Sequence, residues 1–196
     1  MNKSNIKRMV GIALLMAMVV VLQFVGSSIP PIGGTVSISL VLIPIVIGAA
    51  AFGPGAGAIL GGVFGVITLI GCISGTDAGG AMVFQASPAL CVLVVMGKGI
   101  LAGAASGWVY RLLRGRNGYA AMLCASIVCP VVNTGVFLIC MALFFRSVLQ
   151  AWAGGTAVLS YVLSGLVVCN FLPELALNVI FSPAGQRIVR TVDRNK

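Results

Sequence analysis

The chain has 196 residues, of which 60% are hydrophobic and only 8% are charged. A soluble domain carries roughly 25% charged residues, so this composition excludes a soluble globular protein and predicts an integral membrane protein. The net charge of +9 does not by itself indicate nucleic-acid binding, because basic loop residues also set the orientation of membrane proteins. No room is left for a separate soluble domain, so we expect one membrane domain over residues 1–196.

Long apolar segments fill almost the whole sequence. About 20 apolar residues in a helix cross roughly 30 Å of hydrocarbon. Six such segments, separated by turns rich in glycine, proline and serine, predict an all-α bundle of six transmembrane helices at residues 9–25, 37–52, 55–73, 88–113, 119–145 and 157–181. The first segment has a basic start but no small-x-small cleavage site, so we expect a retained helix. The longer connection at 74–87 is expected to be a loop.

The basic residues indicate an orientation. With an intracellular amino terminus, six spans place ten of the twelve lysines and arginines on the inner side. The positive-inside rule therefore predicts a multi-pass protein with both termini cytoplasmic. Aromatic side chains near the predicted helix ends suit the membrane–water interface, and those are Trp108, Tyr110, Tyr119, Trp152 and Tyr161.

Glycine and proline mark places where helices pack or bend. Glycines at a spacing of four form two stripes without side chains, namely Gly57, Gly61 and Gly65 in the third segment and Gly99, Gly103 and Gly107 in the fourth. Such stripes let helix backbones approach closely. We expect them to pack within the bundle rather than against another protein. Proline removes a backbone donor, so kinks are expected at Pro44, Pro130 and Pro173.

Four polar side chains are predicted to lie deep in the last three segments. A charged residue at the centre of a membrane helix costs on the order of 2.5 to 3.5 kcal/mol, so it is normally paired or faces a cavity. At helical rise, Lys98 lies roughly 15 Å from the outer end, Asn170 roughly 18 Å, Asn133 roughly 20 Å and Glu174 roughly 24 Å. Lys98 and Glu174 either neutralise each other as a structural pair or line a ligand cavity, whereas the two asparagines favour the cavity. Asn178 is expected to serve helix packing or capping.

The remaining motifs are informative mainly by absence. Asp77 lies in the glycine-rich connection at 74–87, where it is either a solvated loop tip or part of a gate over an outward cavity. No G-x-x-x-x-G-K-[ST] or G-x-S-x-G motif exists, so neither ATP hydrolysis by a phosphate-binding loop nor serine hydrolysis is indicated. Histidine is absent and the six cysteines form no C-x-x-C pair. We expect no metal site, no cofactor and no enzymatic activity.

Two stretches carry a family resemblance. The first segment reads "KRMVGIALLMAMVVVL", in which Ala13 and Ala17 form an A-x-x-x-A pattern, and residues 40–67 read "LVLIPIVIGAAAFGPGAGAILGGVFGVI". Together with the length and the six predicted helices, these stretches resemble the substrate-binding S components of energy-coupling factor (ECF) transporters, the prokaryotic vitamin importers. The resemblance covers nearly the whole chain.

The resemblance implies a substrate-capture subunit in a prokaryotic plasma membrane. Such a subunit binds a water-soluble vitamin or related nutrient on the outer side and works with a transmembrane coupling subunit and two cytoplasmic ATPases. It implies a ligand site in the outer half of helices four to six, where Lys98, Asn133 and Asn170 are predicted to lie. It also implies that Ala13 and Ala17 face the coupling subunit, although the residues alone favour packing inside the bundle.

Two other functions fit the sequence. A stand-alone secondary transporter would couple uptake to protons through Glu174, since intramembrane carboxylates mark proton relays. A scaffold without a transported ligand would use its buried polar residues for structure only.

Overall fold

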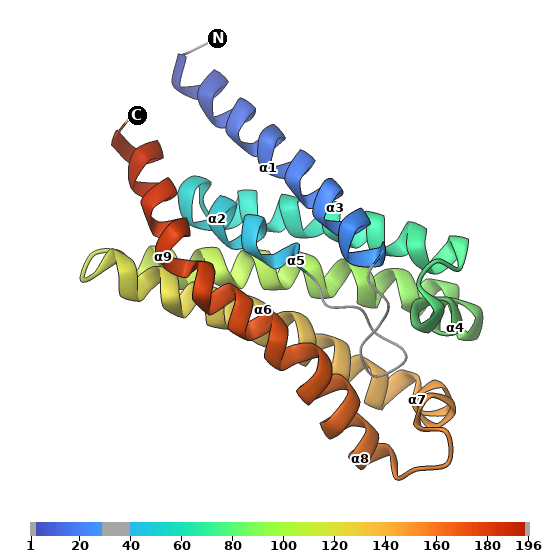
Figure 1. Ribbon diagram of the computed structural model, residues 1–196. Helices are drawn as coiled ribbons and strands as arrows, with labels where there is room; N and C mark the ends of the chain where they lie inside the picture. The colour runs from blue at the N-terminus through green and yellow to red at the C-terminus, as the bar shows by residue number, and fades with distance from the viewer. Residues whose placement is uncertain (1–2, 29–39, 195–196) are drawn as a thin grey trace.

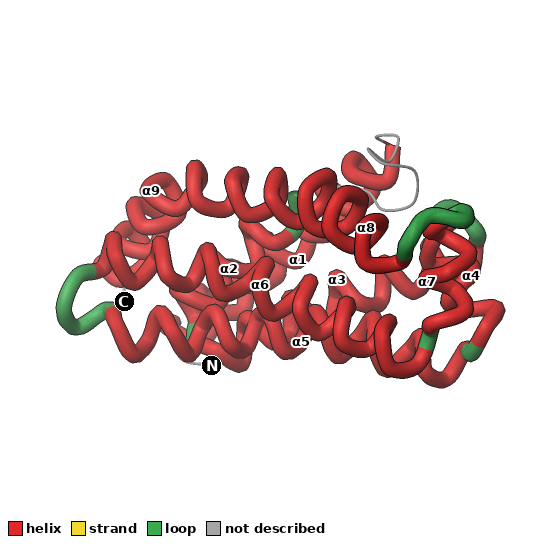
Figure 2. Tube along the Cα trace, turned by 90° about the horizontal axis from the view of Figure 1, so that it is seen from below, coloured by secondary structure: helices red, strands yellow, loops and turns green. Residues whose placement is uncertain are grey.

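The computed structural model describes residues 3–28 and 40–194, which form helices and short turns with no strand. α3, α5 and α6 run in nearly the same direction, α1 and α9 are inclined to them (Figure 1), and α4 and α7 lie at one end of the bundle (Figures 1 and 2). The elements are α1 (Lys3–Ser28), α2 (Leu42–Phe52), α3 (Pro54–Ser74), α4 (Ala78–Ala86), α5 (Pro88–Leu113), α6 (Gly118–Phe144), α7 (Arg146–Ala153), α8 (Val158–Tyr161), the π-helix η1 (Val162–Phe171) and α9 (Leu172–Arg194).

The described helices confirm the all-α prediction but do not establish six full spans. Five are long and apolar enough to cross a membrane, namely Asn5–Gly26, Pro54–Ser74, Pro88–Leu113, Gly118–Phe144 and Val158–Asp193. α2 has only 11 residues, or about 16 Å at helical rise. The first part of its predicted range, residues 37–39, lies outside the described residues. The six-span count and the cytoplasmic termini therefore remain predictions.

α2 behaves as an internal core helix. It packs against α1, α3, α5, α6 and α9, and Leu42, Ile45, Val46 and Ala49 are almost completely inaccessible to solvent. A helix that is apolar on every side is stable when neighbours cover it on every side. The apolar sequence of α2, from which a membrane span was predicted, therefore also fits a short helix enclosed by the bundle.

Among the described residues, two connections between long helices contain short helices, which corrects the prediction of a loop at 74–87. Asp77 caps α4, because its carboxylate accepts a hydrogen bond of 2.9 Å from the N–H of Gly80. An aspartate at this position satisfies one of the free amides of the first helical turn and so favours a helix start. The connection after α6 similarly holds α7, which begins at Arg146 and ends at Ala153.

The last helical rod is longer than predicted and changes its geometry near a proline. It ends at Arg194 rather than at residue 181. The N–H of Leu172 bonds to the carbonyl of Val167, five residues back, at the end of the π-helix. Pro173 follows directly and has no N–H to donate, so the wide turn coincides with the predicted irregularity. Pro44, by contrast, lies in the first turn of α2, where the missing N–H costs no helical bond and gives no reason for a kink.

The glycine stripes pack α3 against α5, which confirms the intramolecular prediction. A Cβ added at Gly61 would collide with the carbonyl of Gly99, and one added at Gly57 would collide with the carbonyl of Gly103. The reverse substitutions meet the same backbones. Close contact between the two backbones fixes the positions of the cavity-lining residues on both helices.

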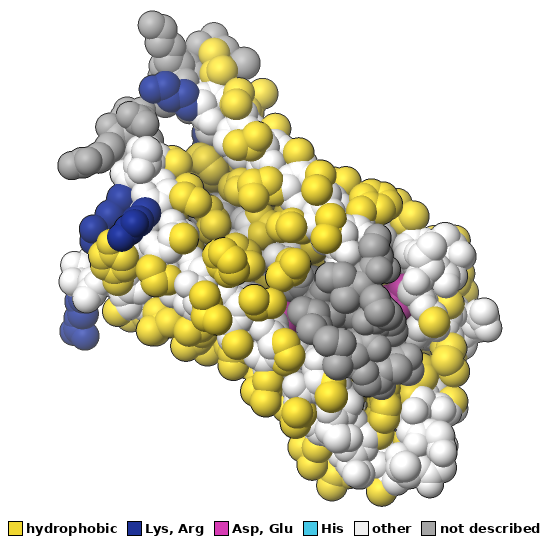
Figure 3. Space-filling view, in the orientation of Figure 1, with side chains coloured by type: hydrophobic (Ala, Val, Ile, Leu, Met, Phe, Trp, Pro, Cys, Tyr) yellow, Lys and Arg dark blue, Asp and Glu magenta, His cyan; other side chains and the backbone are white. Residues whose placement is uncertain are grey.

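Basic side chains gather at the end of the bundle where α1 begins and α9 ends (Figure 3). This basic end also holds the turn between α5 and α6, with Arg111, Arg114 and Arg116 exposed. The sides between the two ends carry exposed large hydrophobic residues such as Leu14, Leu93 and Ile180, as expected for surfaces that face lipid. The opposite end, formed by α4 and α7, carries the cavity described next.

Candidate functional site

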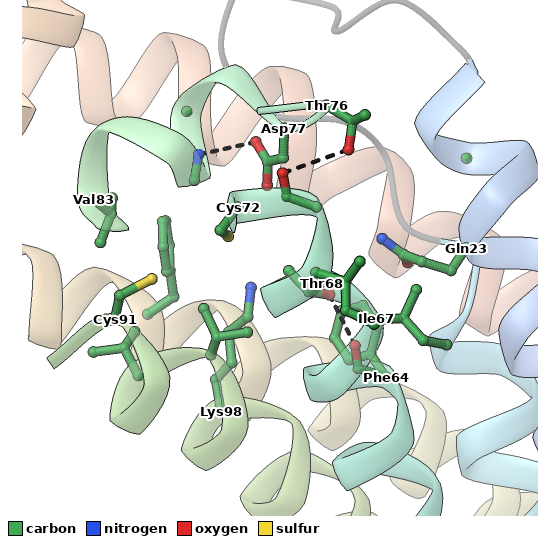
Figure 4. A pocket seen from close by; sticks show the side chains of 18 of the residues that line it. Gln23, Phe64, Ile67, Thr68, Cys72, Thr76, Asp77, Val83, Cys91 and Lys98 are labelled. Atoms are coloured by element: carbon green, nitrogen blue, oxygen red, sulfur yellow. Dashed lines mark hydrogen bonds between the residues drawn. The ribbon is translucent and has the colours of Figure 1, made fainter. Parts of the chain in front are cut away.

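A cavity of about 610 Å³ lies in the half of the bundle nearest α4 and α7 (Figure 4). Its walls come from α1, α3, α4, α5, α6, α7, η1 and the start of α9. The volume falls within the range of about 300 to 1,000 Å³ found for small-molecule sites. The cavity is therefore large enough for an organic ligand of the size of a vitamin.

All four predicted substrate-binding residues line this one cavity. Lys98 projects from α5, Asn133 from α6, Asn170 from η1 and Glu174 from the first turn of α9. Glu174 and Asn133 are buried, with 2% and 6% of their surfaces exposed, and the other two are partly buried. The fold thus brings together residues up to 76 positions apart in the chain. Their role in binding is a proposal that placement alone does not establish.

The ammonium group of Lys98 is held among aromatic rings. Its Nζ lies 4.9 Å from the ring centroid of Phe137 and 5.7 Å from that of Phe64, within the distance at which the negative face of a ring attracts a cation. The ring contacts hold the ammonium at the cavity wall and leave its three donors available to a ligand or water.

The two amides at the cavity wall have unsatisfied oxygens. Within the described part of the chain, neither Oδ1 of Asn133 nor Oδ1 of Asn170 has a hydrogen-bond partner, although both atoms are buried. Asn178 differs, because its Nδ2 donates to the carbonyl of Glu174 at 2.9 Å and the residue does not line the cavity. Buried polar groups are nearly always hydrogen-bonded in proteins, so unsatisfied ones on a cavity wall indicate a place for a polar guest.

Trp152 corrects the prediction that it anchors at the membrane–water interface. It is only 8% exposed, lines the cavity and stacks on Phe137 with ring centroids 6.4 Å apart and an angle of 24°. Its Nε1 is a further buried donor without a partner among the described residues. The sequence contains a pattern that indicates this burial, because Val148, Leu149 and Trp152 form one apolar face of α7. The residues of α7 were instead expected to form a connection.

A second aromatic prediction is also wrong. Tyr110 is buried and donates a hydrogen bond of 3.1 Å to Oε1 of Gln186. It therefore ties α5 to α9 instead of facing the interface. Trp108 and Tyr119 are exposed, as the interfacial prediction requires.

Asp77 lies at the edge of the cavity where α4 begins (Figure 4). Its carboxylate caps α4, and the residue is partly exposed. Next to it, the hydroxyls of Ser74 and Thr76 lie 3.1 Å apart and form a hydrogen bond. This segment covers one side of the cavity, which is compatible with a gate, although a gating role remains a prediction.

The structure leaves Ala13 and Ala17 exposed on α1. Among the described residues, α1 packs only against α2 and α3, and the exposed residues beside the alanines include Leu14 and Met18. The alternative in which both alanines pack inside the bundle is therefore wrong. Their face on α1 is open to lipid or to a partner helix.

Comparisons with known proteins agree with this architecture. A search of curated proteins gave no match. A family model described as "ECF transporter, substrate-specific component" matches residues 7–184, a range that runs from the first turns of α1 into α9 and includes every element lining the cavity. This is a family of transporter components and not of enzymes. The chain belongs to the substrate-specific components of ECF transporters.

Proposed function

We propose that the chain captures a water-soluble vitamin or related small nutrient in the cavity near α4 and α7, on the outer side of a prokaryotic plasma membrane. The observation that carries this proposal is the cavity wall itself. It holds the Lys98 ammonium, the carboxylate of Glu174 with that of Asp77 at the edge, and two amides with unsatisfied oxygens, surrounded by apolar and aromatic side chains. A concave apolar site with a few convergent polar groups is the usual form of a small-molecule site.

The depth of these polar groups supports binding rather than a purely structural role. Ionisable residues within membrane helices are costly and usually mark ligand or ion sites. Here Lys98 and Glu174 reach the cavity from different helices, and the amides of Asn133 and Asn170 do not satisfy each other. A bound nutrient with several hydrogen-bonding groups would satisfy the two amide oxygens and lie beside both charged side chains.

Release into the cell requires energy that this chain has no nucleotide-binding motif to supply. We propose that a transmembrane coupling subunit and two cytoplasmic ATPases supply it, and that the coupling subunit docks on α1 at Ala13 and Ala17. Both alanines are exposed, and small residues permit close approach of a partner helix in lipid.

Native mass spectrometry of the gently purified chain tests the binding proposal. We expect a retained small molecule in the wild type, and loss of that molecule in Lys98→Gln and Asn133→Leu. Arg146→Gln is the matched control, because Arg146 is an exposed cation at the same end of the bundle and does not line the cavity. Equal retention by all four proteins would refute the assignment of the cavity.

Proton-coupled transport through Glu174 is the alternative. The observation that favours it is that this carboxylate is 2% exposed and lines the cavity. Uptake by the purified chain alone in liposomes, driven by a pH gradient and lost in Glu174→Gln, would support it. Uptake only when the coupling subunit and ATPases are present supports the capture-subunit proposal.

A further inference from the structure

The cavity wall is layered, with a polar layer beneath an apolar one. On three helices, a polar residue of the wall has an apolar wall residue four positions away on the side nearer the end formed by α4 and α7. The pairs are Lys98 with Val94 on α5, Asn133 with Phe137 on α6, and Asn170 with Leu166 on η1. Residues four apart lie on one face of a helix, about one turn apart. Trp152, stacked on Phe137, adds an aromatic ring to the apolar layer.

The polar layer contains one basic and one acidic residue. Lys98 and Glu174 both line the cavity. Their charges sum to zero when both are ionised, and the sum is unchanged if a proton passes from the lysine to the glutamate. Asp77 also lines the cavity and acts electrostatically on Lys98. It lies at the edge rather than in this layer, is partly exposed and already accepts a hydrogen bond from Gly80.

A ligand with a net charge at its deep end would disturb this balance. An anion beside Lys98 would leave one excess negative charge within the membrane-spanning part of the bundle, and a cation beside Glu174 would leave one excess positive charge. Buried charge is strongly unfavourable unless it is compensated. A group without net charge avoids both cases, provided that it offers hydrogen-bond donors as well as acceptors.

We propose that the ligand is amphipathic and that the end it inserts among Lys98, Asn133, Asn170 and Glu174 carries no net charge. This end combines donors and acceptors, as a carboxamide, a lactam or a urea does. Lys98 only donates, a carboxylate only accepts, and each asparagine amide does both, so such a group can hydrogen-bond to every type of side chain in the layer. The ligand's apolar or planar part then lies against Phe137 and Trp152. This inference rests on the proposed function and narrows its substrate class.

Three small probes with the same ring test which charge the cavity prefers at the deep end of its ligand. They are pyridine-3-carboxamide, pyridine-3-carboxylate and 3-(aminomethyl)pyridine, which present a neutral, an anionic and a cationic group on the same planar body. Each is titrated against the purified full chain, freed of retained ligand, with the thermal unfolding midpoint as readout, since a ligand that binds the folded state raises that midpoint. In the wild type we expect the carboxamide to bind about tenfold more tightly than either charged probe.

Charge-changing variants should move this preference in opposite directions. Glu174→Gln removes the acidic partner and should shift the preference towards the carboxylate. Lys98→Gln removes the basic partner and should shift it towards the amine. Arg146→Gln removes an exposed charge outside the cavity and should leave the wild-type order unchanged. If a variant fails to fold, the relative affinities of the three probes for the wild type still test the inference.

Each outcome supports or overturns the inference. A wild-type preference for either charged probe, or no shift of the unfolding midpoint with any probe at millimolar concentration, overturns it. The proposed function is judged separately by the retained molecule in native mass spectrometry. A retained molecule with an ionic deep end would leave the capture function standing and would reject only the neutral substrate class.

Discussion

Replacing Asn133 by leucine should make the protein more stable and less able to hold its ligand. Leucine has the same number and branching of side-chain heavy atoms as asparagine but no polar atoms. In the wild type without ligand, the buried Oδ1 of Asn133 has no partner among the described residues, and the side chain is 6% exposed. If Asn133 binds the ligand, its unsatisfied amide destabilises the ligand-free protein. The leucine substitution removes that cost.

The expected magnitude follows from the cost of an unsatisfied buried polar group, about 1 to 3 kcal/mol. Removing that cost should raise the unfolding midpoint by about 2 to 4 °C per kcal/mol for a chain of this length. Losing the hydrogen bond to the ligand should weaken binding by a similar free energy, which corresponds to about 5- to 150-fold. Stability and affinity should therefore move in opposite directions.

The assay compares thermal unfolding of the ligand-free protein with ligand retention in native mass spectrometry. Asn178→Leu is the matched control, because Asn178 also has a buried oxygen without a partner among the described residues but does not line the cavity. It should change stability without weakening retention. A lower unfolding midpoint in Asn133→Leu, or unchanged retention, would show that Asn133 serves the fold and would refute the reasoning.

Three further tests address other parts of the structure. Gly61→Ala should destabilise the protein by about 1 to 3 kcal/mol through overpacking and so reduce the yield of folded protein in size-exclusion chromatography. Gly97→Ala on α5 is the control. A Cβ at this position meets no neighbouring atom within 4 Å, so this variant should behave like the wild type. Leucine at Ala13 and Ala17 should abolish ATP-driven uptake while leaving ligand retention intact; preserved uptake would remove the proposed coupling interface. Trp152→Phe keeps an aromatic ring but removes the indole donor, so retention should fall by about tenfold, and equal retention would show that Nε1 does not contact ligand.

Helical class and packing could be predicted because they depend on local patterns. Apolar segments must satisfy their backbone hydrogen bonds internally in lipid, which requires helices when the segments are long. Glycines four apart must lie on one face, so Gly57 and Gly61 could be recognised as a packing surface before their partners were known. The partner helix, α5, is a finding of the structure, because a stripe does not encode what it contacts.

Burial depends on neighbouring helices, which local sequence patterns do not identify. The short α2 is apolar enough for a span, yet surrounding helices cover it. Trp152 and Tyr110 are amphipathic rings near helix ends, a pattern that suits the interface equally well, but α7 turns Trp152 towards the cavity and Gln186 offers Tyr110 a buried acceptor.

The sequence by itself determined that this is a helical membrane protein with a few costly polar groups in its last helices. Helical rise placed Lys98, Asn133 and Asn170 at similar depth, because distance along a helix is fixed by residue number. Only the tertiary structure decided that they line the same cavity. Rotation of each helix about its axis is set by packing with other helices, and that contact information is spread over residues far apart in the chain.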